Sequence, residues 1–205
     1  IQGRLIEVVS GLPLEEFLRD RIFEPLGMVD TGFSMSPEQR NRFHPLFINT
    51  GSLKGFTYLL DQMTYTPGSR AHFGDAGLLS TMADYSRFCE MLVSGGNFRG
   101  NEIISSESIS TMTQKWSAGY PEEPNAYAEL QGHYNGFSLF VLEDPSKKET
   151  NVPKGIYGWA GYHNTHFWID PQNEMFGLFM SRARPFNWEI PIGLRKIVYE
   201  HYPAP

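Results

Sequence analysis

The chain has 205 residues, of which 40% are hydrophobic and 14% aromatic, and this is enough apolar material for a buried core. A formal net charge of -6 and a pI near 5.5 argue against the basic surface that attracts nucleic acids or anionic membranes. The single cysteine, Cys89, excludes an internal disulfide, and no stretch reaches the roughly 20 apolar residues of a membrane span. We expect a globular chain whose partner is a small molecule or a protein, in a compartment that the sequence leaves open.

Helical patterns dominate the first residues. The stretch from Arg4 to Val9 has helical periodicity with no capping residue before it, which predicts a helix already in progress. We therefore expect that a missing amino-terminal segment or a partner chain is needed. A second helix is predicted over 13–25, because apolar residues recur after Pro13 and Gly27 stands where a carboxy-terminal cap is expected.

Residues 30–78 are rich in Gly, Pro, Asn and Thr, which predicts long irregular loops pinned by buried aromatic rings. The rings are those of Phe33, Phe43, Phe47, Phe56 and Tyr58. Gly74 and Gly77 flank Asp75, a pattern that fits a loop beside a cleft and equally a turn with positive φ.

The clearest helix is predicted after Thr81, which forms a variant of the capping box with Asp84 and precedes an apolar stripe that ends before Gly95. Cys89 lies in this stripe and is expected to be a packed, unreactive thiol. A shorter helix is predicted after Ser105.

Strand patterns follow Gly132. Strands are predicted over 137–142, 156–159, 165–169 and 175–180, with a turn at 170–173 that makes the last two an antiparallel hairpin. An amphipathic helix over 192–198 closes the chain. The predicted organisation is a mainly helical region, 1–130, and a strand-rich region, 131–205, that share one core.

Three segments carry a longer pattern. They are Gly3-Arg4-Leu5-Ile6-Glu7-Val8-Val9 continued by Ile22-Phe23-Glu24-Pro25-Leu26-Gly27-Met28, then Gly77-Leu78-Leu79-Ser80-Thr81-Met82-Ala83-Asp84-Tyr85, then Gly158-Trp159-Ala160-Gly161 followed by Phe167-Trp168-Ile169-Asp170-Pro171. In this order they resemble the serine β-lactamase and penicillin-binding-protein family, including class C-type β-lactamases and related esterases. The resemblance covers nearly the whole chain.

The resemblance implies an α+β fold in which an antiparallel sheet flanked by helices packs against a helical region, here incomplete at the amino terminus. It also implies acyl transfer without a cofactor: a serine hydroxyl attacks a carbonyl, an acyl-enzyme forms, and water resolves it. In this family a lysine one helical turn after the serine and a tyrosine assist the attack.

The chain departs from the family at the nucleophile. No serine is followed three positions later by lysine, and the family's tyrosine motif precedes the stretch that opens this chain. We therefore expect the nucleophile and its base outside these residues. Tyr162-His163-Asn164 matches Tyr-x-Asn at the wrong place and is not assigned as the base.

The third motif remains. Trp159-Ala160-Gly161 stands where relatives have Lys-Thr-Gly, His-x-Gly or Trp-x-Gly, so the resemblance implies that these residues line the substrate cleft. It further implies that the backbone amide of Tyr162 is one donor to the oxyanion. A metal site at His163, His166 and Asp170 is not expected, because a regular strand places the two histidines on opposite faces.

The favoured function is that of a fragment of a serine hydrolase that cleaves a small ester or amide. An esterase is preferred, because the neutral Trp159 lacks the charge that suits the carboxylate of penicillin-like substrates. The alternative is β-lactamase or D-alanyl-D-alanine peptidase activity. A hypothesis of another class is a catalytically inactive fragment or binding module with an uncovered sheet edge.

Overall fold

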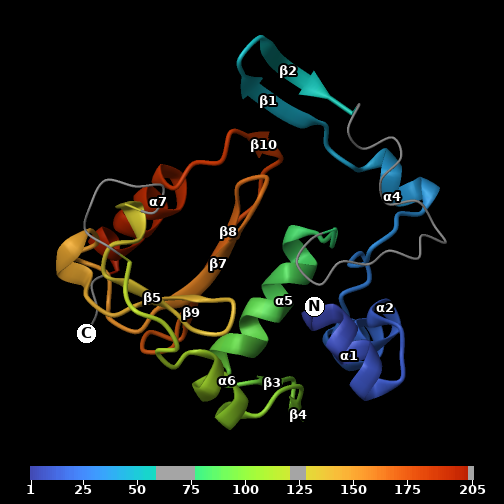
Figure 1. The fold of residues 1–205 in the computed structure, drawn as a ribbon, viewed down its shortest axis with the longest axis horizontal. Coiled ribbons are helices and arrows are strands. Elements are labelled where there is room, and N and C mark those ends of the chain that lie inside the picture. The colour runs from blue at the N-terminus through green and yellow to red at the C-terminus, as the bar shows by residue number, and fades with distance from the viewer. Residues whose placement is uncertain (59–76, 121–127, 203–205) are drawn as a thin grey trace. The chain divides into compact units, whose positions relative to one another are not determined.

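The computed structural model describes residues 1–58, 77–120 and 128–202 of the chain (Figure 1). Helices and antiparallel sheets together give the predicted α+β class. The chain forms two compact units, residues 1–88 and 89–205. The division near residue 130 into a helical and a strand-rich region stays a prediction.

Both predicted helices of the first unit are confirmed. Helix α1 spans Gln2–Ser10; a continuous helical path follows through α2 (Leu14–Leu18), the π-helical turn η1 (Arg19–Phe23) and α3 (Glu24–Leu26). Gly11 and Gly27 end these helices with φ of 73° and 67°. This left-handed conformation is open to glycine at little cost, which is why both helices stop there.

The prediction of irregular loops over 30–78 is wrong for part of that range. Helix α4 (Pro37–Asn41) begins with a capping box between Ser36 and Gln39, and strands β1 (Leu46–Thr50) and β2 (Leu53–Thr57) form an antiparallel hairpin. Phe33 is buried, but the predicted buried rings of Phe47, Phe56 and Tyr58 are exposed.

The outward rings of Phe47 and Phe56 instead pack on each other across the hairpin, with centroids 5.3 Å apart. A cross-strand pair of this kind stabilises a hairpin without burying it, which the composition did not distinguish from a loop. Gly77 has φ of 89°, as a turn requires, whereas Gly74 and Asp75 lie outside the described residues.

Helix α5 (Met82–Val93) starts as predicted, with the Thr81 hydroxyl accepting a 3.2 Å hydrogen bond from the Asp84 amide. The carboxylate of Asp84 accepts from the Asp30 amide at 2.7 Å and from the Thr31 hydroxyl at 2.9 Å. Only half of the capping box therefore forms, and the buried carboxylate fastens the loop at Asp30 to the start of the helix.

Short elements follow α5. Strands β3 (Asn97–Phe98) and β4 (Asn101–Glu102) make a small hairpin that the sequence did not predict. Helix α6 (Ser106–Met112) is confirmed, and its Ser105 cap accepts a hydrogen bond from the Ser108 amide at 3.1 Å.

The second unit is built on a five-stranded sheet in the order β5-β6-β7-β8-β9, with every neighbouring pair antiparallel. The strands are β5 (His133–Asn135), β6 (Phe140–Leu142), β7 (Tyr157–Gly161), β8 (Thr165–Asp170) and β9 (Met175–Phe179). The predicted hairpin of the last two strands is confirmed. The strand predicted over 137–142 is shorter, and β5 was missed because three residues carry no periodicity.

Helix α7 (Glu189–His201) lies beside the sheet (Figure 1). Its Tyr199, Leu194 and Val198 pack with Trp168 and Leu142 in one apolar cluster, which positions the predicted closing helix on the sheet. The short elements η3 (Ala128–Leu130), η4 (Pro145–Lys147) and β10 (Ala183–Arg184) complete the described structure. None of the described helices has the length and apolar character to cross a membrane.

Candidate functional site

The four residues predicted for the site are contiguous at the end of β7. Trp159, Ala160 and Gly161 are the last residues of the strand, and Tyr162 opens the turn at 162–164 that leads into β8. The side chains of Trp159 and Tyr162 are 41% and 69% exposed, so both are accessible to a ligand.

Gly161 is required by its neighbour across the hairpin. A Cβ added at this position would lie 2.2 Å from the Thr165 hydroxyl oxygen. The need for glycine at this position therefore comes from packing within the hairpin, because a larger residue would force the Thr165 side chain to rotate.

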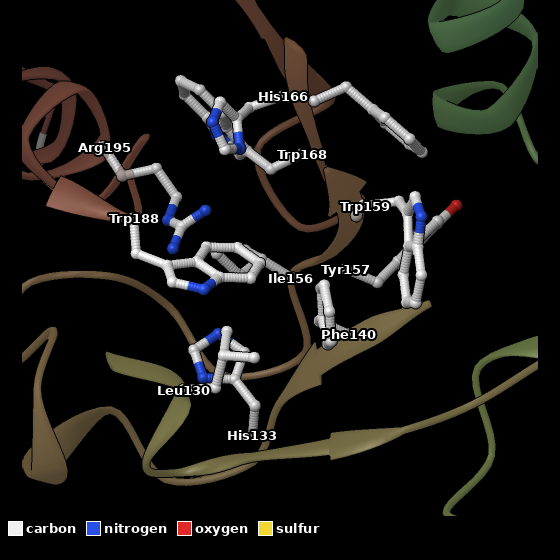
Figure 2. Close-up of a pocket in the computed structure, with 12 residues that line it drawn as sticks. Leu130, His133, Phe140, Ile156, Tyr157, Trp159, His166, Trp168, Trp188 and Arg195 are labelled. Carbon is white, nitrogen blue, oxygen red and sulfur yellow. The ribbon is translucent and has the colours of Figure 1, made fainter. Parts of the chain in front are cut away.

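An aromatic groove lies beside Trp159. The Trp159 ring stacks on Phe140 of β6, with centroids 4.3 Å apart and planes 13° apart, and Phe140 meets the edge of Trp188 at 5.3 Å (Figure 2). The groove has a volume of about 510 Å³ and is lined by Tyr120, Asn135, Ser138, Phe140, Trp159, Ala160, Phe186 and Trp188. No charged side chain is among these described lining residues.

Sequence reasoning found two of these lining residues, Trp159 and Ala160. Phe140, Phe186 and Trp188 come from β6 and from the segment before α7, and nothing local in the sequence connects them with the Trp-Ala-Gly motif. One polar pair of the groove is already engaged, since the Tyr120 hydroxyl donates to the Asn135 side-chain oxygen at 2.8 Å, and the other lining residues are mostly aromatic. The groove therefore suits an uncharged, largely apolar ligand group.

The turn after the motif is held by the segment 181–187. Asn164, 1% exposed, donates 2.9 Å hydrogen bonds to the carbonyls of Ala183 and Pro185 and accepts one of 2.7 Å from the Asn187 amide. The Ser181 hydroxyl is within 3.0 Å of the carbonyls of His163 and Asn164. This network fixes the backbone of residues 163 and 164, directly after Tyr162.

Arg184 in this segment contacts Tyr162 twice. Its guanidinium carbon lies 3.7 Å from the centroid of the Tyr162 ring, and its Nη1 donates a 3.0 Å hydrogen bond to the Tyr162 carbonyl. Across residues 1–58, 77–120 and 128–202, no group accepts a hydrogen bond from the Tyr162 amide. The carbonyl of Tyr162 is engaged while its amide is open to an acceptor.

A second, smaller cavity of about 20 Å³ shares Trp159 and Trp188 with the groove and is lined in part by His133, His166, Trp168 and Arg195 (Figure 2). Burial lowers the pKa of His166 to about 4, with a smaller contribution from the positive charge of Arg195. Burial also lowers the pKa of His133. Both rings are therefore neutral near pH 7.

The structure gives no metal centre at the positions considered in the sequence. His163 lies in the turn and His166 on β8, and within the described part of the chain no three His, Cys, Asp or Glu side chains gather closely enough to hold an ion.

An antiparallel sheet with a helix packed on one face, and a central strand ending in Trp-Ala-Gly beside a groove, defines an α+β protein of the serine β-lactamase and penicillin-binding-protein fold. The family model described as Beta-lactamase matches residues 1–198. The chain belongs to this family.

Two relatives show how much of a family member these residues represent. An uncharacterized protein of Mycobacterium tuberculosis is 26% identical over 193 residues, which are 90% of this chain and 47% of that protein. Penicillin-binding protein 4 of Amycolatopsis lactamdurans is 32% identical over 142 residues, which are 68% of this chain and 35% of that protein. The chain spans less than half the length of these relatives.

Solved structures agree on the fold. EstCE1, described as a hydrolase with promiscuous acyltransferase activity, matches with a TM-score of 0.78 at 20% identity over 96% of this chain and 53% of that one. Simvastatin synthase from Aspergillus terreus matches with a TM-score of 0.77 at 19% identity over 98% of this chain and 53% of that one. At these identities the likeness shows the fold alone.

Proposed function

We propose that this chain supplies the cleft strand and oxyanion donor of a serine hydrolase that cleaves an ester through an acyl-enzyme. The nucleophilic serine and its base would lie outside these residues, because no serine here is followed three positions later by lysine. Relatives that are more than twice as long as the matched region support such a division.

Each residue of the motif has a role in this proposal. Trp159, Ala160 and Gly161 line the cleft, and the Tyr162 amide donates to the oxygen that becomes negatively charged as the serine attacks. The open amide of Tyr162 on a fixed turn supports this role, since a donor of this kind lowers the barrier by roughly 2.7–4 kcal/mol only if it is aimed in advance.

The observation that carries the preference for an ester is the uncharged groove at Trp159. A substrate with a free carboxylate, such as a penicillin or a D-alanyl peptide, is favoured by a cation beside it, and none of the described residues that line the groove is charged. β-Lactamase or D-alanyl-D-alanine peptidase activity remains the alternative, in view of the similarity to a penicillin-binding protein. Arg184, a cation close to the motif, is not among the described residues that line the groove, and its guanidinium contacts Tyr162.

A catalytically inactive binding module is the second candidate. It is favoured by the absence of a Ser-x-x-Lys sequence, and by the apolar residues that α1 exposes, Leu5, Val8 and Val9. In either case we propose that an amino-terminal segment or a partner chain covers this surface.

The test is the intact mass of the natural protein under denaturing conditions, followed by labelling with a fluorophosphonate, which reacts with activated serines. A mass well above 23.4 kDa, or a second polypeptide, with the label outside residues 1–205 supports the hydrolase. A single 23.4 kDa species that takes no label contradicts it and favours the binding module. Two substrates distinguish the activities: hydrolysis of the ester p-nitrophenyl butyrate without hydrolysis of the β-lactam nitrocefin supports an esterase over a β-lactamase.

A further inference from the structure

We infer that Arg184 is a positioning residue for the reaction, holding Tyr162 so that its backbone amide faces the forming oxyanion. The inference rests on the proposed function and goes beyond it, since it assigns a task to a residue 22 positions away from the donor that it serves.

The two contacts of Arg184 restrain Tyr162 at different atoms. Stacking at 3.7 Å fixes the ring and therefore the direction of the Cα–Cβ bond, whereas the 3.0 Å hydrogen bond fixes the carbonyl. On the other side, the Gly161 carbonyl accepts a 3.1 Å hydrogen bond from the Asn164 amide, and Gly161 is paired with Thr165 across the hairpin. The Gly161 carbonyl and the Tyr162 N–H belong to one planar peptide group, and the Tyr162 carbonyl belongs to the next, so these contacts restrain the direction of the Tyr162 N–H from both sides.

Arg184 can apply this restraint because its own backbone is held. The Ala183 amide donates to the His163 carbonyl at 3.1 Å, and the carbonyls of Ala183 and Pro185 accept from the buried Asn164. The backbone on either side of Arg184 is therefore held in place, which limits where its guanidinium can lie. Tyr162, at 69% exposed, has little burial of its own to order it, so its ring is held by the contact with Arg184 and by the His163 ring, whose centroid lies 5.3 Å away.

The charge of Arg184 favours the same reaction step. No carboxylate among residues 1–58, 77–120 and 128–202 forms a salt bridge with its guanidinium, so its positive charge is not neutralised by the described residues. A cation beside the residue that donates to the oxyanion stabilises negative charge that develops there, and it does so more in the transition state than in the neutral ester.

The experiment compares three variants of the natural protein that contains this chain. Arg184→Met keeps an unbranched, largely apolar side chain in place of the arginine stem and removes both the charge and the donor; Arg184→Lys keeps the charge but loses the planar group that stacks on the ring. Arg21→Met, which removes an exposed arginine on η1, is the matched control. Each is assayed with a neutral p-nitrophenyl ester, and kcat is expressed per serine titrated by the end point of fluorophosphonate labelling.

The expected result is a fall in kcat of about 10- to 100-fold for Arg184→Met, with KM changed less than about twofold, since the loss of a whole oxyanion donor costs about 100- to 1,000-fold. Arg184→Lys should recover only part of the loss, and Arg21→Met should match the wild type. A role in folding alone would lower the titratable fraction and leave kcat per site unchanged, which overturns the inference.

A role for Arg184 in binding a substrate carboxylate is separated with an ester that carries one. If KM for that ester rises in Arg184→Met while kcat for the neutral ester stays at the wild-type value, the inference is overturned and Arg184 is a specificity residue. If the wild type hydrolyses the neutral ester and Arg184→Met has the same kcat per titrated serine, this inference is overturned while the proposed function stands. If the wild type hydrolyses no ester and takes no label, the proposed function is overturned, and this inference is overturned with it.

Discussion

Arg195 of α7 donates hydrogen bonds from Nε and Nη2, each 2.7 Å long, to the two carboxylate oxygens of Glu149. Both residues are buried, at 8% and 5% exposed. The pair joins the closing helix to the chain just after η4, ahead of the strand that carries the Trp-Ala-Gly motif. Its fixed planar geometry makes α7 a support of the sheet rather than a mobile end.

Replacing Arg195 by methionine should reduce the free energy of unfolding by about 3–5 kcal/mol, because the carboxylate of Glu149 is left buried without its cation. Urea denaturation followed by tryptophan fluorescence measures the change. Lys196→Met, next in sequence and exposed, is the control and should stay within about 0.5 kcal/mol of the wild type. Equal stability of both variants would mean that the pair is not formed in solution.

Stability should fall as the pH drops from 6.5 towards 4. The pKa of His166 is about 4 in the folded protein and near 6.5 when exposed, so the unfolded chain takes up the proton first and acid favours unfolding. The free energy of unfolding that depends on neutral His166 is fully present above pH 6.5. It falls by about 1.4 kcal/mol per pH unit as the pH drops from there to about 4. His133, whose pKa burial also lowers, acts in the same direction.

Urea midpoints at several pH values test this dependence. His166→Phe should have a shallower loss of stability between pH 6.5 and 4 than the wild type, whereas His201→Gln, which removes an exposed histidine, should keep the wild-type slope. An unchanged slope in His166→Phe would show that this ring titrates normally.

Asp84→Ala should destabilise the protein by about 1–3 kcal/mol. The substitution leaves the Asp30 amide and the Thr31 hydroxyl without their shared acceptor and removes the salt bridge to Arg87. Thermal unfolding measures the loss, and Glu90→Ala, exposed on the same helix, provides the comparison within about 0.5 kcal/mol of the wild type. A loss no larger than that of Glu90→Ala would rule out the clamp at Asp30.

Two glycines should respond in opposite directions to alanine. At Gly177, an added Cβ would lie 2.1 Å from the Trp168 indole, so Gly177→Ala should displace that ring and cost about 1–3 kcal/mol. At Gly193, within α7, nothing lies within 4 Å, and alanine should stabilise by about 0.4–1 kcal/mol. Melting temperatures of the two variants decide this, and shifts of the same sign would contradict the packing of Trp168 over β9.

Cys89 should not react with a thiol reagent in the folded protein. Its side chain is fully buried, and burial raises the pKa of the thiol to about 12, so almost no thiolate exists at pH 8. Ellman's reagent should therefore detect the thiol only after unfolding in guanidinium chloride. Rapid modification of the native protein would show that α5 opens or packs differently.

Much of the secondary structure could be predicted from the sequence. The helix stop at Gly27, the Thr81 cap, and the hairpin between 165 and 179 follow from signals within a few residues of each other. Prediction from local sequence also fails in places. The Phe47–Phe56 hairpin has the composition of a loop, and the sequence alone does not distinguish an exposed phenylalanine paired across a hairpin from a buried one.

The sequence by itself determined the family, the strand that carries Trp159 and the absence of a Ser-x-x-Lys motif, since these are properties of contiguous residues. Only the tertiary structure brought Phe140, Phe186 and Trp188 to that strand, and Arg184 to Tyr162. The physical reason is that a groove or a buried ion pair depends on which distant segments pack together, and the free energy of that packing is shared by many residues without a periodic signal in any one segment.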